Sequence, residues 1–148
     1  MKIMVINGPN LNMLGIREKE IYGSNTYDDL AAYIEEEAKK RNIDLCFFQS
    51  NHEGALVDQI QRAYFEKYDG IILNPAAYTH TSIAIADAIK AIAPLPVIEV
   101  HISDIDHRDE FRKRSFCAPY CLKQIKGEGF KGYIVALDAI IDHLLSSS

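Results

Sequence analysis

The sequence has few cysteines, no long apolar run and no excess of positive charge. Its three cysteines, Cys46, Cys117 and Cys121, form no Cys-x-x-Cys pair, so they predict neither a disulfide framework nor a zinc site. We therefore expect a reducing compartment. No stretch approaches the ~18 apolar residues of a membrane-spanning helix, and the apolar run after Met1 is far shorter than a signal-peptide core. We expect a cytoplasmic protein that makes no membrane contact.

The charge balance argues against nucleic acid as a partner. The formal net charge is -5 at pH 7, and the basic run 39–41 follows the acidic run 35–37 on one predicted helix face. A nucleic-acid-binding surface needs a basic patch, which this pattern does not supply. The 148 residues, of which 48% are hydrophobic, are instead typical of one globular domain with a substantial core.

Short apolar runs alternate with segments of helical periodicity along the chain. The runs predict strands at 3–6, 45–48, 71–73, 97–100 and 121–125. Helices are expected from a Thr26-to-Asp29 capping box to residue 41, around 56–64, after His80 and over 130–144. This alternation predicts a single α/β domain over residues 1–148, a flavodoxin-like three-layer sandwich. Its five-stranded parallel sheet should have the order 2-1-3-4-5.

Two segments lack a clear period. Residues 10–23 are polar and interrupted by Gly15 and Gly23, and so long a loop in a compact domain is usually a lid or disordered. We expect a mobile lid there. Residues 103–114 are charged, and Ser103 or Asp104 is expected to cap a short helix.

The helix after Asn74-Pro75 has small or apolar residues on two opposite faces. Ile85, Ile89 and Ile92 share one side, whereas Ala84 and Asp87 lie on the other. A helix that is apolar all round is buried, so we expect the sheet to cover one face and a second subunit the other. Asp87 would lie on this covered face, where burying a carboxylate costs free energy unless the group is paired or hydrogen-bonded.

Polar side chains follow the first four predicted strands, where ligands bind in open α/β sheets. They are Asn7, Asn10 and Asn12, then Asn51, His52 and Glu53, then Asn74 and His80, and finally His101 and Ser103. Amides and imidazoles at one sheet edge suit a small ligand rich in hydroxyl or carboxylate groups. Arg112 and the backbone amides after His101 could hold a carboxylate.

Candidate acid and base groups stand out among these residues. Glu99 precedes His101 by two residues on one strand face, where a carboxylate can orient an imidazole for proton transfer. The phenol of Tyr22, with an ordinary pKa of ~10, can act as a base only if a cation such as Arg17 favours its phenolate. His52 is more simply interpreted as a capping or packing residue.

Metal and phosphate sites are less well supported. His101, Asp104, Asp106 and His107 are possible metal ligands, but their spacing matches no common metal motif. Residues 8–15 lack the Gly-Lys-Ser/Thr of a phosphate loop. We therefore expect neither a metal nor another cofactor.

Five motifs in chain order resemble those of type II 3-dehydroquinate dehydratase. They are Asn7 to Gly15 with Arg17 to Gly23, Gln49 to Gly54, Asn74 to Ser82, Glu99 to Ser103, and Arg108 to Ser115. The resemblance implies a flavodoxin-like enzyme of the shikimate pathway. It would convert 3-dehydroquinate reversibly to 3-dehydroshikimate by trans-dehydration through an enolate, with no metal, imine or cofactor.

The resemblance also implies residue roles. Tyr22 would remove the C2 proton with support from Arg17, and His101, oriented by Glu99, would protonate the departing C1 hydroxyl. Asn12 would stabilise the enolate through a water molecule. Substrate binding would involve Asn74, His80, Arg112, Ile102, Ser103 and, from a neighbouring subunit, Asp87. The family assembles as a dodecamer, a tetramer of trimers.

The chain departs from the family pattern at Ala76, Ala86, Asp104 and Asp106, among other positions. Other flavodoxin-like functions are less well supported, because a phospho-receiver needs acidic residues after the first strand and a flavin carrier needs a phosphate loop. A decayed dehydratase kept as a binding protein is a further alternative, which intact Tyr22 and His101 disfavour. The sequence leaves open whether the enzyme serves biosynthesis or quinate breakdown.

Overall fold

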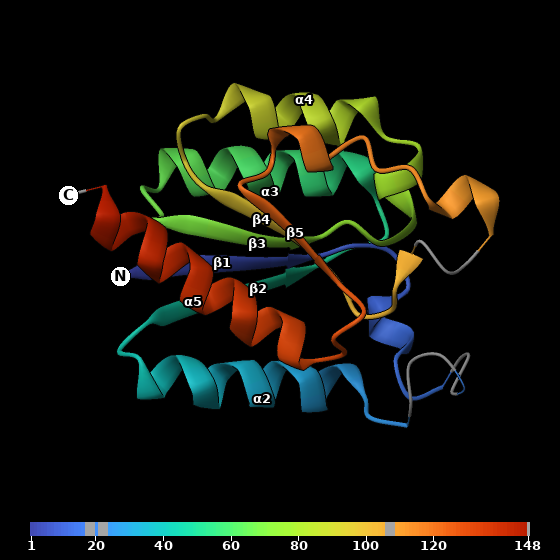
Figure 1. The fold of residues 1–148 in the computed structure, drawn as a ribbon, viewed down its shortest axis with the longest axis horizontal. Coiled ribbons are helices and arrows are strands. Elements are labelled where there is room, and N and C mark those ends of the chain that lie inside the picture. The colour runs from blue at the N-terminus through green and yellow to red at the C-terminus, as the bar shows by residue number, and fades with distance from the viewer. Residues whose placement is uncertain (17–19, 21–23, 106–108, 148) are drawn as a thin grey trace.

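Five parallel strands form one sheet at the centre of the molecule (Figure 1). The computed structural model describes residues 1–16, 20, 24–105 and 109–147. The strands are β1 (Lys2–Asn7), β2 (Asp44–Gln49), β3 (Gly70–Asn74), β4 (Val97–His101) and β5 (Lys123–Lys126). Their order β2-β1-β3-β4-β5 confirms the predicted topology.

Four α-helices cover the sheet in two layers. They are α2 (Tyr27–Lys40), α3 (Glu53–Phe65), α4 (Ile83–Ala91) and α5 (Lys131–Ser146). Helices α3 and α4 pack on one face, and α2 and α5 pack on the other (Figure 1). The three-layer sandwich therefore has two separate hydrophobic cores.

Strand β1 shows why the sheet needs both layers. Ile3 and Val5 belong to the core beneath α2 and α5, whereas Met4 and Ile6 belong to the core beneath α3 and α4. Successive side chains of a strand point to opposite faces, so a continuous apolar run is stable only when both faces are covered. All four side chains are fully buried.

Helix starts follow the local sequence. Thr26 accepts a hydrogen bond from the Asp29 backbone N–H at 3.1 Å and donates its own N–H to Asp29 Oδ2 at 2.9 Å, which confirms the predicted capping box. At α4, Ser82 Oγ accepts the Ile85 N–H at 2.9 Å. Each cap satisfies a backbone donor that the helix itself leaves free.

One predicted boundary was wrong. The fifth strand begins at Lys123 rather than at Cys121, because a 3-10 helix at Ala118–Tyr120 contains Pro119 and ends against Cys121. In the segment 103–114 the structure has a 3-10 helix at Glu110–Arg112, and Ile105, directly after Asp104, also has 3-10 geometry, so the cap at Ser103 or Asp104 stays a prediction. Residues 106–108 lie outside the described part.

Helix α4 leaves one face open in the single chain. Ile85 and Ile89 are buried against the sheet, while Ala84, Asp87 and Ala91 are exposed. The two-faced pattern is therefore present, and its cover by a second subunit stays a prediction. Among the described residues, no helix is both long and apolar enough to cross a membrane.

Candidate active site

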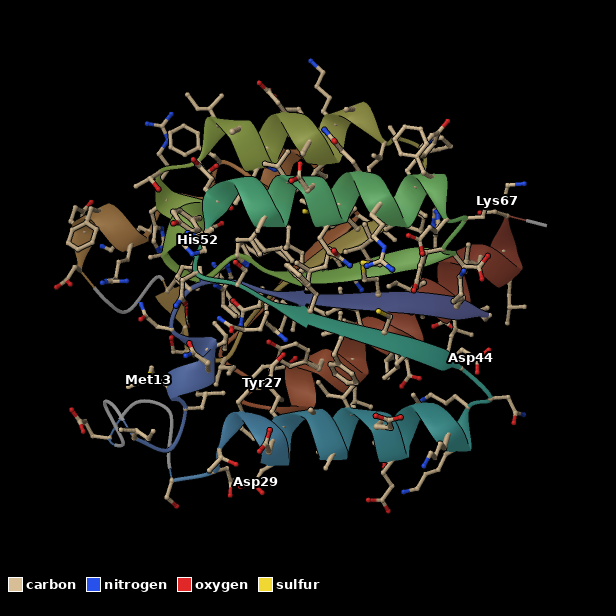
Figure 2. The ribbon with its side chains drawn as sticks, turned by 180° about the vertical axis from the view of Figure 1, so that it is seen from behind. Met13, Tyr27, Asp29, Asp44, His52 and Lys67 are labelled. Atoms are coloured by element: carbon tan, nitrogen blue, oxygen red, sulfur yellow. The ribbon has the colours of Figure 1, made fainter. Side chains whose placement is uncertain are left out.

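A pocket opens at the carboxyl ends of β1, β3 and β4. In Figure 2 this edge lies near Met13 and His52, and Asp44 and Lys67 mark the opposite edge of the sheet. The predicted site residues Asn74, His80, His101, Ile102, Ser103 and Arg112 all line the pocket. The remaining lining residues are Pro9, Asn10, Leu11, Leu14, Ala76, Ala77 and Ile105.

The loop after β1 and the loop after β3 contact each other through their backbones at this edge of the sheet. The Gly8 N–H donates to the Asn74 carbonyl at 2.7 Å, and a Cβ at position 8 would lie 2.7 Å from the Pro75 carbonyl oxygen. A side chain at that distance would force the loops apart, so only glycine fits. The close approach fixes the loop after β1 against the loop after β3.

Glu99 and His101 form a buried pair on β4. Their side chains share a face because they are two residues apart on a strand, and their exposed fractions are 0% and 5%. His101 Nε2 contacts Glu99 Oε2 directly. An ionised carboxylate only accepts, so Nε2 carries a proton and Nδ1 is the nitrogen left to exchange one with the pocket.

The Glu99 carboxylate accepts further hydrogen bonds from neutral side chains. Thr79 Oγ1 donates at 2.7 Å, Ser115 Oγ lies 2.9 Å from Oε1, and Gln124 Nε2 lies 3.2 Å from Oε2. Burial alone would raise the pKa of Glu99, but the His101 contact and the hydrogen bonds from Thr79 and Gln124 outweigh it and hold the pKa below its usual value. Glu99 is therefore anionic at neutral pH.

Asn74 is oriented by a chain of hydrogen bonds that crosses the core. Its Nδ2 donates to the Tyr133 hydroxyl at 3.0 Å, and Tyr133 donates to Asn7 Oδ1 at 2.6 Å. Asn7 Nδ2 donates in turn to the Tyr27 hydroxyl at 3.3 Å. Burial raises the pKa of Tyr133, which keeps it a neutral phenol and a proton donor.

Asn74 also holds the turn that follows β3. Its Oδ1 accepts the Ala76 N–H at 3.0 Å, and Ala76 has a left-handed backbone with φ 52°. A non-glycine residue is strained in that region.

His80 and Arg112 bring further polar groups to the pocket. His80 Nδ1 donates to the Arg114 carbonyl at 2.7 Å, and burial lowers the pKa of the ring, so a neutral His80 offers Nε2 as an acceptor. Arg112 Nε lies 3.5 Å from Asp109 Oδ2 but makes no hydrogen bond, although the atom is buried. A ligand oxygen would satisfy this donor.

Other predicted site residues lie elsewhere. Asn12 is exposed beside the pocket and its Oδ1 accepts from Gln49 Nε2 at 3.4 Å. Asp87 is exposed on α4 and is not part of the pocket lining. Arg17 and Tyr22 lie outside the described residues. His52 precedes α3 without a side-chain cap and is exposed.

Four contributors were missed by the sequence analysis. Thr79 and Ser115 lie inside recognised motifs, but hydroxyls in turns commonly bond to nearby backbone, so nothing marked them as partners of Glu99. Tyr133 fits the apolar periodicity of its helix and is buried, so the pattern indicates a core residue and gives no sign that its hydroxyl makes hydrogen bonds. The alternation of β5 could have placed Gln124 beside Glu99, had the strand register been known.

The described residues contain no group of three His, Cys, Asp or Glu side chains placed to hold a metal ion. Asp106 and His107, two of the four possible ligands considered from the sequence, lie outside that part of the chain. The polar groups that converge on the pocket are thus imidazole, amide, hydroxyl and guanidinium. They are suited to bind oxygen atoms and transfer protons.

Known proteins resemble this chain over nearly its full length. The family described as "Dehydroquinase class II" matches residues 1–141. A 3-dehydroquinate dehydratase of Clostridium perfringens is 56% identical over 146 residues, which cover 99% of each chain.

Solved structures give the same result. The type II dehydroquinase of Butyrivibrio crossotus has a TM-score of 0.93 and 55% identity, covering 95% of this chain and 97% of that one. The type II dehydroquinase of Propionibacterium acnes has a TM-score of 0.89 and 42% identity, covering 94% of each chain.

Proposed function

Because this chain belongs to the class II dehydroquinase family, we propose that it catalyses the reversible dehydration of 3-dehydroquinate to 3-dehydroshikimate in the shikimate pathway. The observation that carries the proposal is the buried pair of Glu99 and His101, which reaches a pocket shared with Asn74 and Arg112. Such a site supplies a positioned proton donor together with groups that bind oxygen atoms.

The reaction removes one proton and one hydroxyl from the substrate. Tyr22, as a phenolate favoured by Arg17, takes the C2 proton, and the electron pair forms an enolate with the adjacent ketone. When the enolate collapses, a C1–C2 double bond forms and the C1 hydroxyl leaves as water with a proton from His101. Asn12, whose carboxamide is exposed at the rim, stabilises the enolate through a water molecule. The C2 proton is acidic only if the enolate is stabilised, so polar groups preorganised around the carbonyl should matter as much as the base.

His101 is supported as the acid by its contact with Glu99. The carboxylate accepts the Nε2 proton and fixes the orientation of the ring, so Nδ1 is the nitrogen left to deliver a proton to the departing hydroxyl. After the step the ring is neutral and Nε2 still donates to Glu99. The carboxylate thus serves as an orienting group and not as the proton donor.

Substrate recognition is assigned to the polar groups of the pocket wall. The backbone N–H of Ile102 and the hydroxyl of Ser103 bind the carboxylate. Asn74, His80 and Arg112 bind the substrate as well, and the buried Arg112 Nε without a hydrogen-bond partner supports this role.

Closure and assembly complete the proposed site. Residues 10–23 act as the lid, whose base is anchored by the buried Leu11 and Leu14. Trimers, joined into a dodecamer, cover the open face of α4 and bring Asp87 to a neighbouring pocket; the exposed Ala84, Asp87 and Ala91 support this arrangement. The cytoplasm remains the predicted location.

The direct test is an absorbance assay with purified protein and 3-dehydroquinate. The product is a conjugated enone that absorbs in the near ultraviolet, so absorbance should rise with time. Circular dichroism establishes that the protein is folded, and an active relative serves as the positive control. A folded protein that gives no rise beside a working control would refute the proposed activity.

A further inference from the structure

The carboxylate of Glu99 is held by three segments besides its own strand. Thr79 comes from the 3-10 helix Ala76–His80, Ser115 follows the 3-10 helix Glu110–Arg112, and Gln124 lies opposite Glu99 on β5. Their distances to the carboxylate are 2.7, 2.9 and 3.2 Å. All three side chains are neutral donors.

The two hydroxyls also contact each other. Thr79 Oγ1 lies 2.8 Å from Ser115 Oγ, which in turn accepts the Ala118 N–H at 3.0 Å. Each hydroxyl has a single proton, so either both donate to Glu99, or one donates to the other and the second donates to Glu99. In the latter case the first hydroxyl polarises the second and strengthens its bond to the carboxylate. Every arrangement stabilises the negative charge.

We propose that Thr79 and Ser115 are positioning residues that keep Glu99 ionised, so that the proton of the Glu99–His101 pair stays on the imidazole. The inference rests on the proposed roles of Glu99 and His101. A buried carboxylate and imidazole in contact can share one proton in two ways, as an ion pair or as a neutral pair. Burial favours the neutral pair, and donors to the carboxylate favour the ion pair.

The location of that proton decides how directly the pair can act as an acid. Glu99 is 0% exposed and does not line the pocket, whereas His101 does. A proton held by Glu99 could reach the C1 hydroxyl only through the ring, by a second transfer to Nε2 as Nδ1 gives up its own proton. Removing the hydroxyl donors should therefore reduce turnover without removing any group that touches the substrate.

The titratable groups around Glu99 come from three elements. His101 is on β4, His80 is on the 3-10 helix that carries Thr79, and Cys117 and Cys121 precede β5. Burial first, and then the nearby Glu99 charge, raises the pKa of both thiols, so they are neutral and do not compete for the proton. Among the described residues, the donors to Glu99 other than His101 are neutral side chains.

The same hydroxyl contact joins the acid pair to the segment after Arg112. Arg114 and Phe116, which flank Ser115, are bonded to the 3-10 helix as well: the Arg114 carbonyl accepts from His80 at 2.7 Å, and the Phe116 N–H donates to the Thr79 carbonyl at 2.8 Å. Ser115 thus connects the segment that follows Arg112 to the pair of Glu99 and His101.

The test compares variants that remove or keep each hydroxyl. Thr79→Val and Ser115→Ala remove it, and Thr79→Ser and Ser115→Thr keep it. Ser82→Ala is the matched control, because Ser82 is also a buried hydroxyl but bonds only the Ile85 N–H in its cap. Thermal unfolding and circular dichroism establish that each variant is folded, and one folded variant of each kind is sufficient.

The pH dependence of kcat distinguishes positioning from a structural role. Loss of a hydrogen bond to the carboxylate should raise the pKa of Glu99, so the acidic limb should move upward by about one pH unit. We expect this shift and a lower kcat in Thr79→Val and Ser115→Ala, with little change in KM. Thr79→Ser and Ser115→Thr should retain the wild-type limb. Ser82→Ala should lower only the unfolding temperature.

A measurement independent of activity separates this inference from the proposed function. In protein labelled with ¹³C at the glutamate carboxyl, the Glu99 resonance should titrate at higher pH in Thr79→Val and Ser115→Ala than in the wild type. An unshifted resonance, or an unshifted acidic limb in a folded variant, would overturn the inference even if the enzyme is active. An equal shift in Ser82→Ala would overturn it too. An inactive wild type with shifted variants would refute only the proposed function.

Discussion

The Tyr133 hydroxyl on the last helix accepts a hydrogen bond from Asn74 at the end of β3, at 3.0 Å, inside a fully buried part of the core. The same hydroxyl donates to Asn7 at 2.6 Å. One phenol therefore orients amides at the ends of two neighbouring strands. The wall of the pocket depends on a residue that lies outside the pocket.

Tyr133→Phe should weaken substrate binding. Without the hydroxyl, the Asn74 amide loses the partner that orients it, and two buried groups are left unsatisfied. We expect KM to rise about tenfold, equivalent to ~1.4 kcal/mol, and stability to fall by about 1–3 kcal/mol. Steady-state kinetics and denaturant unfolding measure both. Tyr33→Phe, a half-buried tyrosine of α2, is the control, and an equal rise in its KM would argue against a specific role for Tyr133.

Ala76→Gly should stabilise the protein. Ala76 has φ 52°, a conformation that glycine adopts without strain. We expect a gain of about 1 kcal/mol and a rise in Tm of roughly 2–4 °C. Ala77→Gly tests the neighbouring exposed position and should destabilise. A lower Tm for Ala76→Gly than for wild type would show that the turn stores no strain.

In Glu99→Gln the free energy of unfolding should decrease less steeply than in wild type as the pH is lowered. The pKa of Glu99 is lowered by folding, so its contribution is complete above the unfolded pKa of ~4.3 and disappears as the pH falls through the folded value. Unfolding free energies measured from pH 7 downward should thus fall more steeply in wild type. Glu35→Gln, on an exposed position of α2, should keep the wild-type slope. Parallel curves for Glu99→Gln and wild type would contradict the assignment.

Tyr22→Phe should nearly abolish turnover and leave substrate affinity unchanged. Only the phenolic base is removed, and general base catalysis contributes about 10²–10⁴-fold. Single-turnover kinetics and calorimetric titration separate chemistry from binding. Tyr64→Phe, on the exposed end of α3, is expected to behave as wild type. Unaltered turnover in Tyr22→Phe would remove this residue from the mechanism.

Dehydration should continue in excess chelator. The proposed steps use a phenolate, an imidazole and hydrogen-bond donors, none of which requires a divalent cation. We expect kcat to change by less than about twofold after prolonged dialysis against EDTA, since no positioned group is lost. Loss of activity that returns on addition of a divalent metal would instead support a metal site.

The parts of the fold predicted from sequence are those set by local periodicity. Continuous apolar runs such as that of β1, their alternation with helices and the right-handed crossover rule led to the predicted sheet order, and a spacing of two places Glu99 and His101 on one face. The start of β5 was misjudged because Cys121 and Leu122 read as apolar strand residues, while Pro119 turns the chain before them.

The supporting contacts of the site could not be predicted in this way. Tyr133 and Asn7 are 126 residues apart, and no pattern in either segment indicates that a phenol will meet an amide. Ser115 and Glu99 are 16 residues apart on different elements. Such contacts depend on how the layers pack, which periodicity does not describe.

The close approach at Gly8 limits how this enzyme could change over generations. An exposed lining residue such as Ala77 can be exchanged singly, because no close backbone contact fixes its size. Position 8 has no intermediate of that kind, since even alanine would meet the Pro75 carbonyl at 2.7 Å. Mutations could therefore change the pocket lining one residue at a time, whereas a single substitution of this glycine would separate the loop after β1 from the loop after β3.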